Sequence, residues 1–229
     1  MHLKERLLCL VLAALTPASA ASLDLEQLLA NMDRTASGFE SMQAGITRMK
    51  YMALLEEKTT ESGEMYVRKD KNGKVRLLIN FREPYNYHLA VSGDKAEIYR
   101  PRIATVEEYS IAKHRDTFQQ AFLLGFGTTA DYLRENYKLQ LLGEDHAADQ
   151  ATVRLELIPK SEGMRKQVPK LEMWVSTETW QAVRQKLHQP GGEDYRVFTY
   201  NDVKLNPKIP DRIFKLDIPR GTKRVFPQR

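Results

Sequence analysis

The sequence predicts an α+β protein that is mainly β, in which a curved antiparallel sheet of about eleven strands forms an incomplete β-barrel. Three observations support this prediction. Apolar and polar residues alternate in two long blocks, which is the period of half-buried strands. Two segments, 24–37 and 116–133, have helical spacing instead. A chain of 229 residues is long enough for one domain with a full core. We therefore expect an N-terminal helix and a mid-chain helical lid to cover the sheet.

Residues 1–20 have the pattern of a secretory signal peptide. Lys4 and Arg6 form a basic region, residues 7–15 are apolar, and Ala18-Ser19-Ala20 is a cleavage site of the A-x-A kind. Cleavage near Ala20 would make this an exported protein. An uncleaved membrane anchor is the alternative, but the apolar run is roughly half of the ~20 residues that span a bilayer.

Removal of that segment would leave residues 21–229 as a single domain without cysteine. The only cysteine of the chain is Cys9, which lies in the apolar run. The mature chain would then have no disulfide, no thiol nucleophile and no cysteine metal ligand. We expect its hydrophobic core alone to hold it together.

The first element expected after the signal is an amphipathic helix over 24–37. Asp24 and Gln27 have the spacing of a capping box, and Gly38 is a natural stop. The apolar residues at helical spacing are Leu25, Leu28, Leu29, Met32 and Ala36.

The first block of strands contains an Asn-Gly hairpin. Asn72-Gly73 is suited to the positive φ angles of a type I′ turn. In the strand that follows, the apolar residues alternate on one face: Val75, Leu77, Ile79 and Phe81. The strands expected in this block are 42–56, 63–70, 74–82, 86–92, 96–100 and 105–110.

Helical spacing returns before the second block of strands. Asp116 and Gln119 repeat the cap arrangement, and a second short helical segment is expected around 130–133. The strands expected afterwards are 137–142, 151–158, 170–176, 179–188 and 194–203. Because strands twist, so long an antiparallel sheet should curl towards a barrel.

Composition and motifs favour a binding protein over an enzyme. The formal net charge of +5 is too small to indicate a nucleic-acid partner. The five histidines are scattered, and no spacing typical of metal ligands, a P-loop or a G-x-S-x-G nucleophile is present. We therefore expect no catalysis, no metal and no cofactor.

Several motifs occur in a characteristic order along the chain. They are Gly63-Glu64-Met65-Tyr66-Val67, the apolar strand that ends at Pro84, the Ser92-Gly93-Asp94 turn, Tyr99-x-Pro101, and Phe214 followed by Pro219-x-Gly221. In this order, and with the mid-chain helices, the sequence resembles the periplasmic outer-membrane lipoprotein carrier proteins, the LolA family. The resemblance covers roughly residues 25–225.

The resemblance implies an apolar cavity between the sheet and its helices that receives acyl chains. The residues expected to line it are Met65, Val67, Leu77, Ile79, Phe81, Leu89 and Ile98 from the sheet and Phe118, Phe122 and Phe126 from the helical insertion. For each of these residues, permanent packing in the core is the alternative.

One position departs from the family pattern. The family commonly has an arginine followed by proline at the end of the second strand, where the arginine helps to hold the lid closed. Here Lys69 stands at that position, Arg68 precedes it and Asp70 replaces the proline. Arg68 and Lys69 are the candidates for a lid latch, but lysine lacks the planar fork of arginine, which argues against one.

The resemblance also implies a function. A monomeric carrier of this family shields the acyl chains of lipoproteins and moves them from the inner to the outer membrane. Its partners would be acylated lipoproteins, an inner-membrane lipoprotein-releasing transporter and an outer-membrane receptor. The alternative is a LolA-like envelope protein that binds another lipid, such as a glycolipid or hopanoid, or that senses mislocalised lipoproteins. A purely structural or protein-binding envelope domain and a hydrolase are the remaining alternatives.

Overall fold

The structure, a computed structural model, describes residues 23–70, 72–82, 84–114 and 123–227. The strands are β1 (Ser41–Met52), β2 (Glu57–Lys69), β3 (Val75–Phe81), β4 (Tyr87–Ser92), β5 (Lys95–Arg100), β6 (Thr105–Ser110), β7 (Tyr137–Ala147), β8 (Gln150–Pro159), β9 (Leu171–Ser176), β10 (Ala182–His188), β11 (Tyr195–Leu205) and β12 (Lys223–Val225). The helices are α1 (Leu25–Ser37), α3 (Ala130–Asn136) and α4 (Glu162–Arg165), and short 3-10 turns are η1 (Ala53–Leu55), η2 (Pro101–Ile103), η3 (Ala112–His114) and η4 (Asp211–Phe214).

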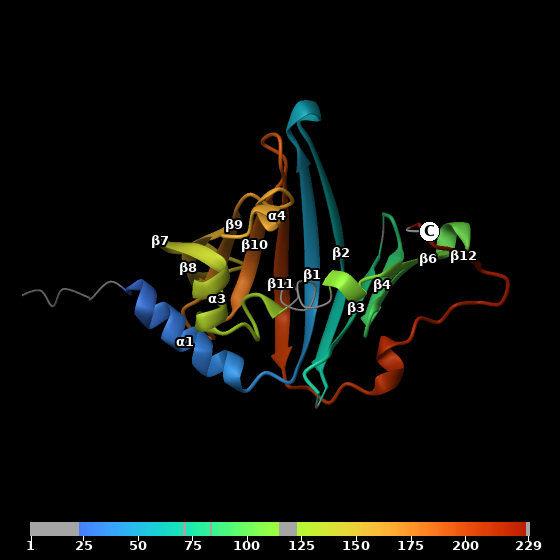
Figure 1. Ribbon diagram of the computed structural model, residues 1–229, viewed down its shortest axis with the longest axis horizontal. Helices are drawn as coiled ribbons and strands as arrows, with labels where there is room; N and C mark the ends of the chain where they lie inside the picture. The colour runs from blue at the N-terminus through green and yellow to red at the C-terminus, as the bar shows by residue number, and fades with distance from the viewer. Residues whose placement is uncertain (1–22, 71, 83, 115–122, 228–229) are drawn as a thin grey trace, which may run out of the picture.

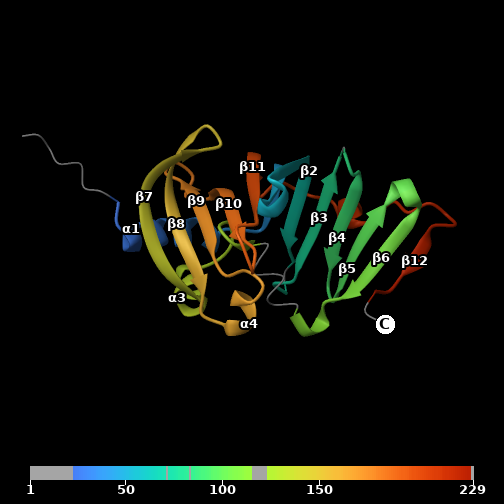
Figure 2. The ribbon, with the colours of Figure 1, turned by 90° about the horizontal axis from the view of Figure 1, so that it is seen from above.

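Twelve strands of the described residues form one sheet in the order β12-β6-β5-β4-β3-β2-β1-β11-β10-β9-β8-β7. Neighbouring strands are antiparallel, apart from the parallel pair of β12 and β6. Seen from above in Figure 2, the sheet is a curved wall that runs from β7 to β12. It is not closed, so the predicted fold class, an incomplete barrel with helices, is confirmed.

The N-terminal helix has the cap that the sequence predicts. Gln27 N–H donates to Asp24 Oδ1 at 2.7 Å, and Asp24 N–H donates to Gln27 Oε1 at 3.2 Å. Leu28, Leu29 and Met32 are buried against the sheet. At about 1.5–3 kcal/mol for each buried aliphatic side chain, this face is what attaches α1 to the sheet.

The helices cover one half of the concave face. In Figure 1, α1 and α3 lie in front of the half that contains β7 to β10. Leu133 of α3 and Leu155 of β8 are both fully buried in the main core cluster, together with Met173 of β9. The core of the protein therefore lies between these helices and the concave face of the sheet.

A second, smaller core lies on the convex face. Leu78 and Ala90, which point away from the concave side of β3 and β4, pack with Ile209 and Phe214 of the C-terminal segment. The turn η4 thus covers the outside of these strands, as Figure 1 shows at the lower right.

The predicted boundaries need correction at the first hairpin. The strand expected over 42–56 ends at Met52, η1 forms the turn, and β2 begins at Glu57 instead of residue 63. Glu56 takes the left-handed conformation that closes this turn. In Figure 1 the β1–β2 hairpin rises above the rest of the sheet, and Leu54 at its tip is 94% exposed.

The Asn-Gly turn also differs from the prediction. Gly73 has a positive φ of 77°, but Asn72 does not, so the turn is not type I′. Gly73 N–H donates to the carbonyl oxygen of Asp70, and the Asp70 carboxylate accepts from Asn72 N–H and Lys74 N–H. The side chain of Asp70 therefore organises a longer loop, which the Asn-Gly pair alone did not indicate.

Two further differences concern the ends of the chain and the insertion. β12 was not among the expected strands, and it pairs with β6 through residues 223–225. Of the helix expected over 116–133, residues 115–122 lie outside the described residues, as does the predicted signal peptide. The described part contains α3, whose N-cap is Thr129.

Candidate functional site

A groove of about 460 Å³ lies on the concave face of the sheet, on the half that α1 and α3 leave uncovered. It is lined by Arg48, Glu61, Ile79, Phe81, Tyr85, Tyr87, Leu89, Ile98, Arg100 and Phe198. One wall is apolar and the rim is polar. Its volume is within the ~300–1,000 Å³ of pockets that hold one small molecule.

Strand register builds the apolar wall. Ile79 of β3 is paired with Leu89 of β4, and Leu89 is paired with Ile98 of β5. Directly opposed residues of antiparallel strands point to the same face, so these three side chains form a row across the sheet. The alternating pattern in the sequence is the cause of this row.

A polar cluster forms the rim above the row. Arg48 Nη2 donates to Glu61 Oε2 at 2.6 Å, and Tyr87 Oη donates to the same oxygen at 3.1 Å. The guanidinium of Arg48 also lies 4.9 Å from the ring centre of Phe81. Burial raises the pKa of Tyr87 above its ordinary value, so its hydroxyl stays a donor. The buried carboxylate of Glu61 is thus satisfied by two donors, and Arg48 is held over the groove.

Four of the residues predicted to contact lipid line this groove, namely Ile79, Phe81, Leu89 and Ile98. Met65, Val67 and Leu77 point to the same face, but they do not line the groove, and they are buried in the main core cluster. Ile79 and Phe81 belong to that cluster too, whereas Leu89 and Ile98 are only partly buried.

The aromatic residues predicted from the helical insertion are placed only in part. Phe126 is buried, and its ring packs edge-on against Tyr200 at 5.0 Å, away from the groove lining. Phe118 and Phe122 lie outside the described residues. Contact of any of the ten residues with lipid stays a prediction.

Tyr87, Arg48 and Phe198 line the groove, which the sequence did not predict. Tyr87 could have been found, because it precedes Leu89 by two residues on a predicted strand. Arg48 and Phe198 could not, because they meet only through the pairing of β1 with β11, across about 150 residues of sequence.

The two candidate latch residues lie elsewhere. Arg68 points to the convex face, where it donates to the carbonyl oxygen of Ile209 at 2.6 Å, pairs with Asp211 and lies 5.2 Å from the ring centre of Phe214. Lys69 is exposed. Within the described residues, Arg68 therefore holds the C-terminal segment, which the sequence did not predict.

Replacing Arg68 with glutamine is expected to loosen residues 209–216. The loss of one charge-assisted hydrogen bond and one cation–π contact should cost about 1–2 kcal/mol locally. Hydrogen exchange of the Ile213 amide, which bonds to Pro210, should become faster. Arg82→Gln is the control, because Arg82 pairs with Glu64 and its side chain is 70% exposed. Equal exchange in both variants would contradict this role.

A larger hollow of about 870 Å³ lies at the other end of β1 and β2. Its lining combines Phe39 and Ile209 with charges of both signs, among them Glu40, Arg68 and Lys208. It is bordered by strand ends and the C-terminal segment instead of a continuous apolar row. We therefore regard the concave groove as the candidate site.

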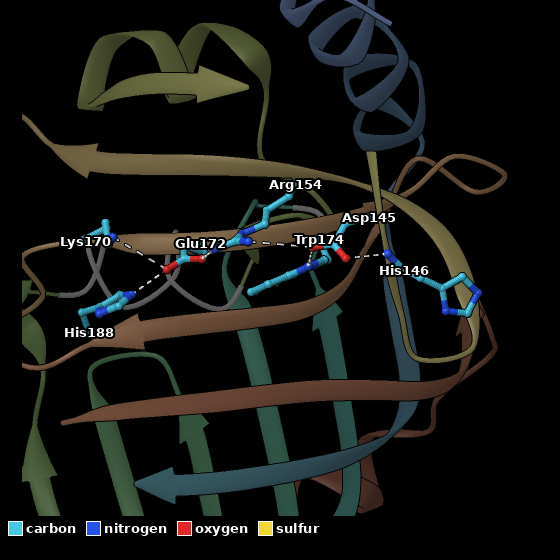
Figure 3. Close-up of polar contacts among 7 residues, drawn as sticks. All are labelled: Asp145, His146, Arg154, Lys170, Glu172, Trp174 and His188. Carbon is cyan, nitrogen blue, oxygen red and sulfur yellow. Dashed lines mark hydrogen bonds and ion pairs between the residues drawn. The ribbon is translucent and has the colours of Figure 1, made fainter. Parts of the chain in front are cut away.

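A polar cluster also occupies the convex face of β7 to β10 (Figure 3). The carboxylate of Glu172, which is 2% exposed, accepts from Arg154 Nε at 2.9 Å and lies 2.7 Å from His188 Nε2. Trp174 Nε1–H donates to Asp145 Oδ2 at 2.8 Å, and the guanidinium of Arg154 lies 5.1 Å from the Trp174 ring centre. Every member has a partner, so the cluster has a structural explanation.

Glu172 should make stability depend on pH. Burial raises the pKa of its carboxyl, but the hydrogen bonds from His188 and Arg154 outweigh burial and leave the pKa below its ordinary value of 4.5. A lowered folded-state pKa means that the ionised group stabilises the fold above about pH 4.5 and loses this effect as pH falls through the folded pKa.

We expect Glu172→Ala to lower the free energy of unfolding at pH 7 by about 2 kcal/mol. The value is below the ~3–5 kcal/mol of fully buried pairs, since Arg154 and His188 stay partly exposed. The difference from the parent should shrink in urea titrations below pH 4. Glu162→Ala, which breaks an exposed pair with Lys166, is the control and should cost under ~0.5 kcal/mol. A Glu172→Ala loss that is the same at both pH values would contradict the linkage.

The described residues lack a metal site and a membrane-spanning helix. They contain no group of three or more His, Cys, Asp or Glu side chains that could hold a metal ion. None of their helices has the length and apolarity of a membrane span.

Comparisons with known proteins show the fold. No protein-family model and no curated protein matches the sequence. An uncharacterised conserved protein from Thermus thermophilus matches in structure with a TM-score of 0.54 and 11% identity, over 88% of this chain and 98% of that chain. MucB matches with a TM-score of 0.52 and 14% identity, over 83% of this chain. The match spans 62% of the MucB chain, and a complex of MucB with MucA is known from Pseudomonas aeruginosa.

A LolA superfamily protein from Nitrosomonas europaea also matches, with a TM-score of 0.41 and 15% identity, over 86% of this chain and 99% of that chain. The chain shares its overall fold, an open curved sheet with helices against the concave face, with MucB and the Thermus thermophilus protein. Identities this low show the fold and nothing finer.

Proposed function

We propose that this protein binds acyl chains in the concave groove and carries them, as part of a lipid or a lipidated protein, through the periplasm. One observation supports this most: a hollow of about 460 Å³ whose wall is the row of Ile79, Leu89 and Ile98. The sequence had already pointed to these three side chains.

The physical need for such a wall is simple. Moving an acyl chain from a membrane into water costs about 0.8 kcal/mol of free energy for each CH₂ group that becomes exposed. An unshielded lipid anchor would therefore stay in its membrane. A carrier has to offer an apolar surface that replaces this contact. Side chains that are only partly buried, such as Leu89 and Ile98, can offer it without unfolding of the core.

The first candidate cargo is the acylated end of a lipoprotein on its way from the inner to the outer membrane. An inner-membrane transporter would load the carrier and an outer-membrane receptor would unload it. The periplasmic location is part of this proposal and rests on the signal-like pattern of residues 1–20.

A second candidate cargo is another lipid, and the size of the groove favours it. A volume of about 460 Å³ suits one small ligand better than the two or three chains of a lipoprotein. A role in protein binding is an outcome to test as well, because MucB, which shares the fold, has been solved in complex with MucA.

The test is to purify the protein from its native envelope and identify what comes with it by mass spectrometry. An acylated peptide would support the lipoprotein carrier, and free lipid would support the second cargo. A protein that copurifies without lipid, and that binds neither a palmitoylated peptide nor free palmitate in titrations, would refute the proposal. The same peptide without its acyl chain is the control.

A further inference from the structure

A second hollow of different character lies next to the candidate groove. The second hollow, of about 370 Å³, is lined by Arg48, Lys50, Met52, Thr59, Glu61, Tyr85 and Arg196. Arg48, Glu61 and Tyr85 line both hollows. The two hollows are therefore adjacent: the first is apolar near Leu89, and the second is polar and lies towards the β1–β2 hairpin.

Strand register places cations together in the second hollow. Lys50 of β1 and Arg196 of β11 are direct cross-strand partners. Each lies two residues along its strand from a residue of the groove lining, Arg48 or Phe198, so both point to the concave face. Like charges that are directly opposed destabilise a sheet. Within the described residues neither Lys50 nor Arg196 has an ion-pair partner, so no ion pair among these residues offsets this cost.

The carboxylates nearby are engaged. Glu61 accepts from Arg48 and from Tyr87, which satisfies its Oε2 oxygen twice. Asp194, two residues before Arg196, accepts from the Ala53 N–H at 2.7 Å. The second hollow is therefore lined by three cations, Arg48, Lys50 and Arg196, and by one carboxylate, that of Glu61.

From this arrangement we infer that the preferred ligand is a single-chain lipid with an anionic headgroup, a phosphate or a carboxylate. Its tail lies along Ile79, Leu89 and Ile98, and its headgroup lies between Lys50 and Arg196. The inference rests on the proposed function, since it requires that the groove accepts an acyl chain. An oxyanion between the two cations would also remove their mutual repulsion.

The test compares two probes with the same palmitoyl tail. Lysophosphatidic acid has an anionic phosphate, and monopalmitoylglycerol is neutral. Their dissociation constants are measured by displacement of a fluorescent fatty-acid analogue. We expect the phosphate probe to bind roughly tenfold more tightly at low salt, and the preference to shrink as salt is raised.

Two double variants then locate the preference. Lys50→Gln with Arg196→Gln should bring the two dissociation constants close together and leave that of the neutral probe unchanged. Lys58→Gln with Lys186→Gln is the matched control. It removes the same charge from the convex face, where Lys58 and Lys186 lie over the rings of Tyr51 and Tyr195. The control should keep the preference.

The outcomes separate the inference from the function that it rests on. Equal binding of both probes by the parent protein, or equal loss of preference in the two double variants, would overturn the headgroup assignment and leave acyl binding in place. Failure of both probes to bind would overturn the proposed function together with the inference.

Discussion

Replacing Leu89 with glutamate is expected to weaken the binding of a palmitoyl ligand by about 100-fold, or ~2.7 kcal/mol. Leu89 stands at the centre of the apolar row, paired with Ile79 on one side and Ile98 on the other. A carboxylate there would lose water when a tail enters the groove, and no cation is opposed to it in the strand register. Titration with a fluorescent fatty-acid analogue gives the affinity.

Two variants separate binding from folding. Leu89→Met keeps the volume and the apolar character, so it should bind like the parent. Leu77→Ala lies on the same face but is fully buried, so it should lose about 2–5 kcal/mol of stability and still bind lipid while folded. If Leu89→Glu unfolds the protein as strongly as it weakens binding, the row belongs to the core and the carrier proposal loses its main support.

Replacing Gly63 with alanine is expected to be the most destabilising small change in the sheet, with a loss of about 3 kcal/mol or more. Gly63 of β2 is paired with Phe81 of β3. A Cβ atom at this position would lie 2.1 Å from the carbonyl oxygen of Asn80, and this atom belongs to the backbone. The pairing of β2 with β3 would have to open.

Gly45→Ala is the matched control, because Gly45 also lies in a strand and its nearest neighbour would be 3.5 Å from the new Cβ. Urea unfolding of both variants measures the difference. Because Phe81 lines the groove, Gly63→Ala should also weaken palmitate binding, whereas Gly45→Ala should leave it unchanged. Similar stability of the two variants would show that the strands separate at little cost.

Local signals in the sequence were sufficient for individual elements. The Asp24 and Gln27 pair predicted a helix start that the hydrogen bonds confirm. The alternation from Val75 to Phe81 predicted a strand and the face that it buries. Such signals depend on neighbours in the chain, and a single sequence contains them in full.

The polar first half of β2 could not be predicted from local sequence patterns. Residues 57–62 read Glu-Lys-Thr-Thr-Glu-Ser and have no apolar alternation, yet they pair with β1 over their whole length. Their backbone hydrogen bonds come from β1, which is itself a long strand. The rim of the groove follows from this pairing, since it brings Glu61 opposite Arg48. No pattern in residues 57–62 alone could have indicated it.

The position of β1 has a consequence for how the chain folds. β1 connects the two halves of the sheet, because it pairs with β2 in a local hairpin and with β11 across about 150 residues. The hairpins from β2 to β6 and from β7 to β11 can form from nearby residues, but the two halves can join only after residue 195 is available. Contacts so distant in sequence slow folding, since loop closure precedes any gain from them. We therefore expect substitutions at the β1–β11 seam to slow refolding more than substitutions of equal cost within either half.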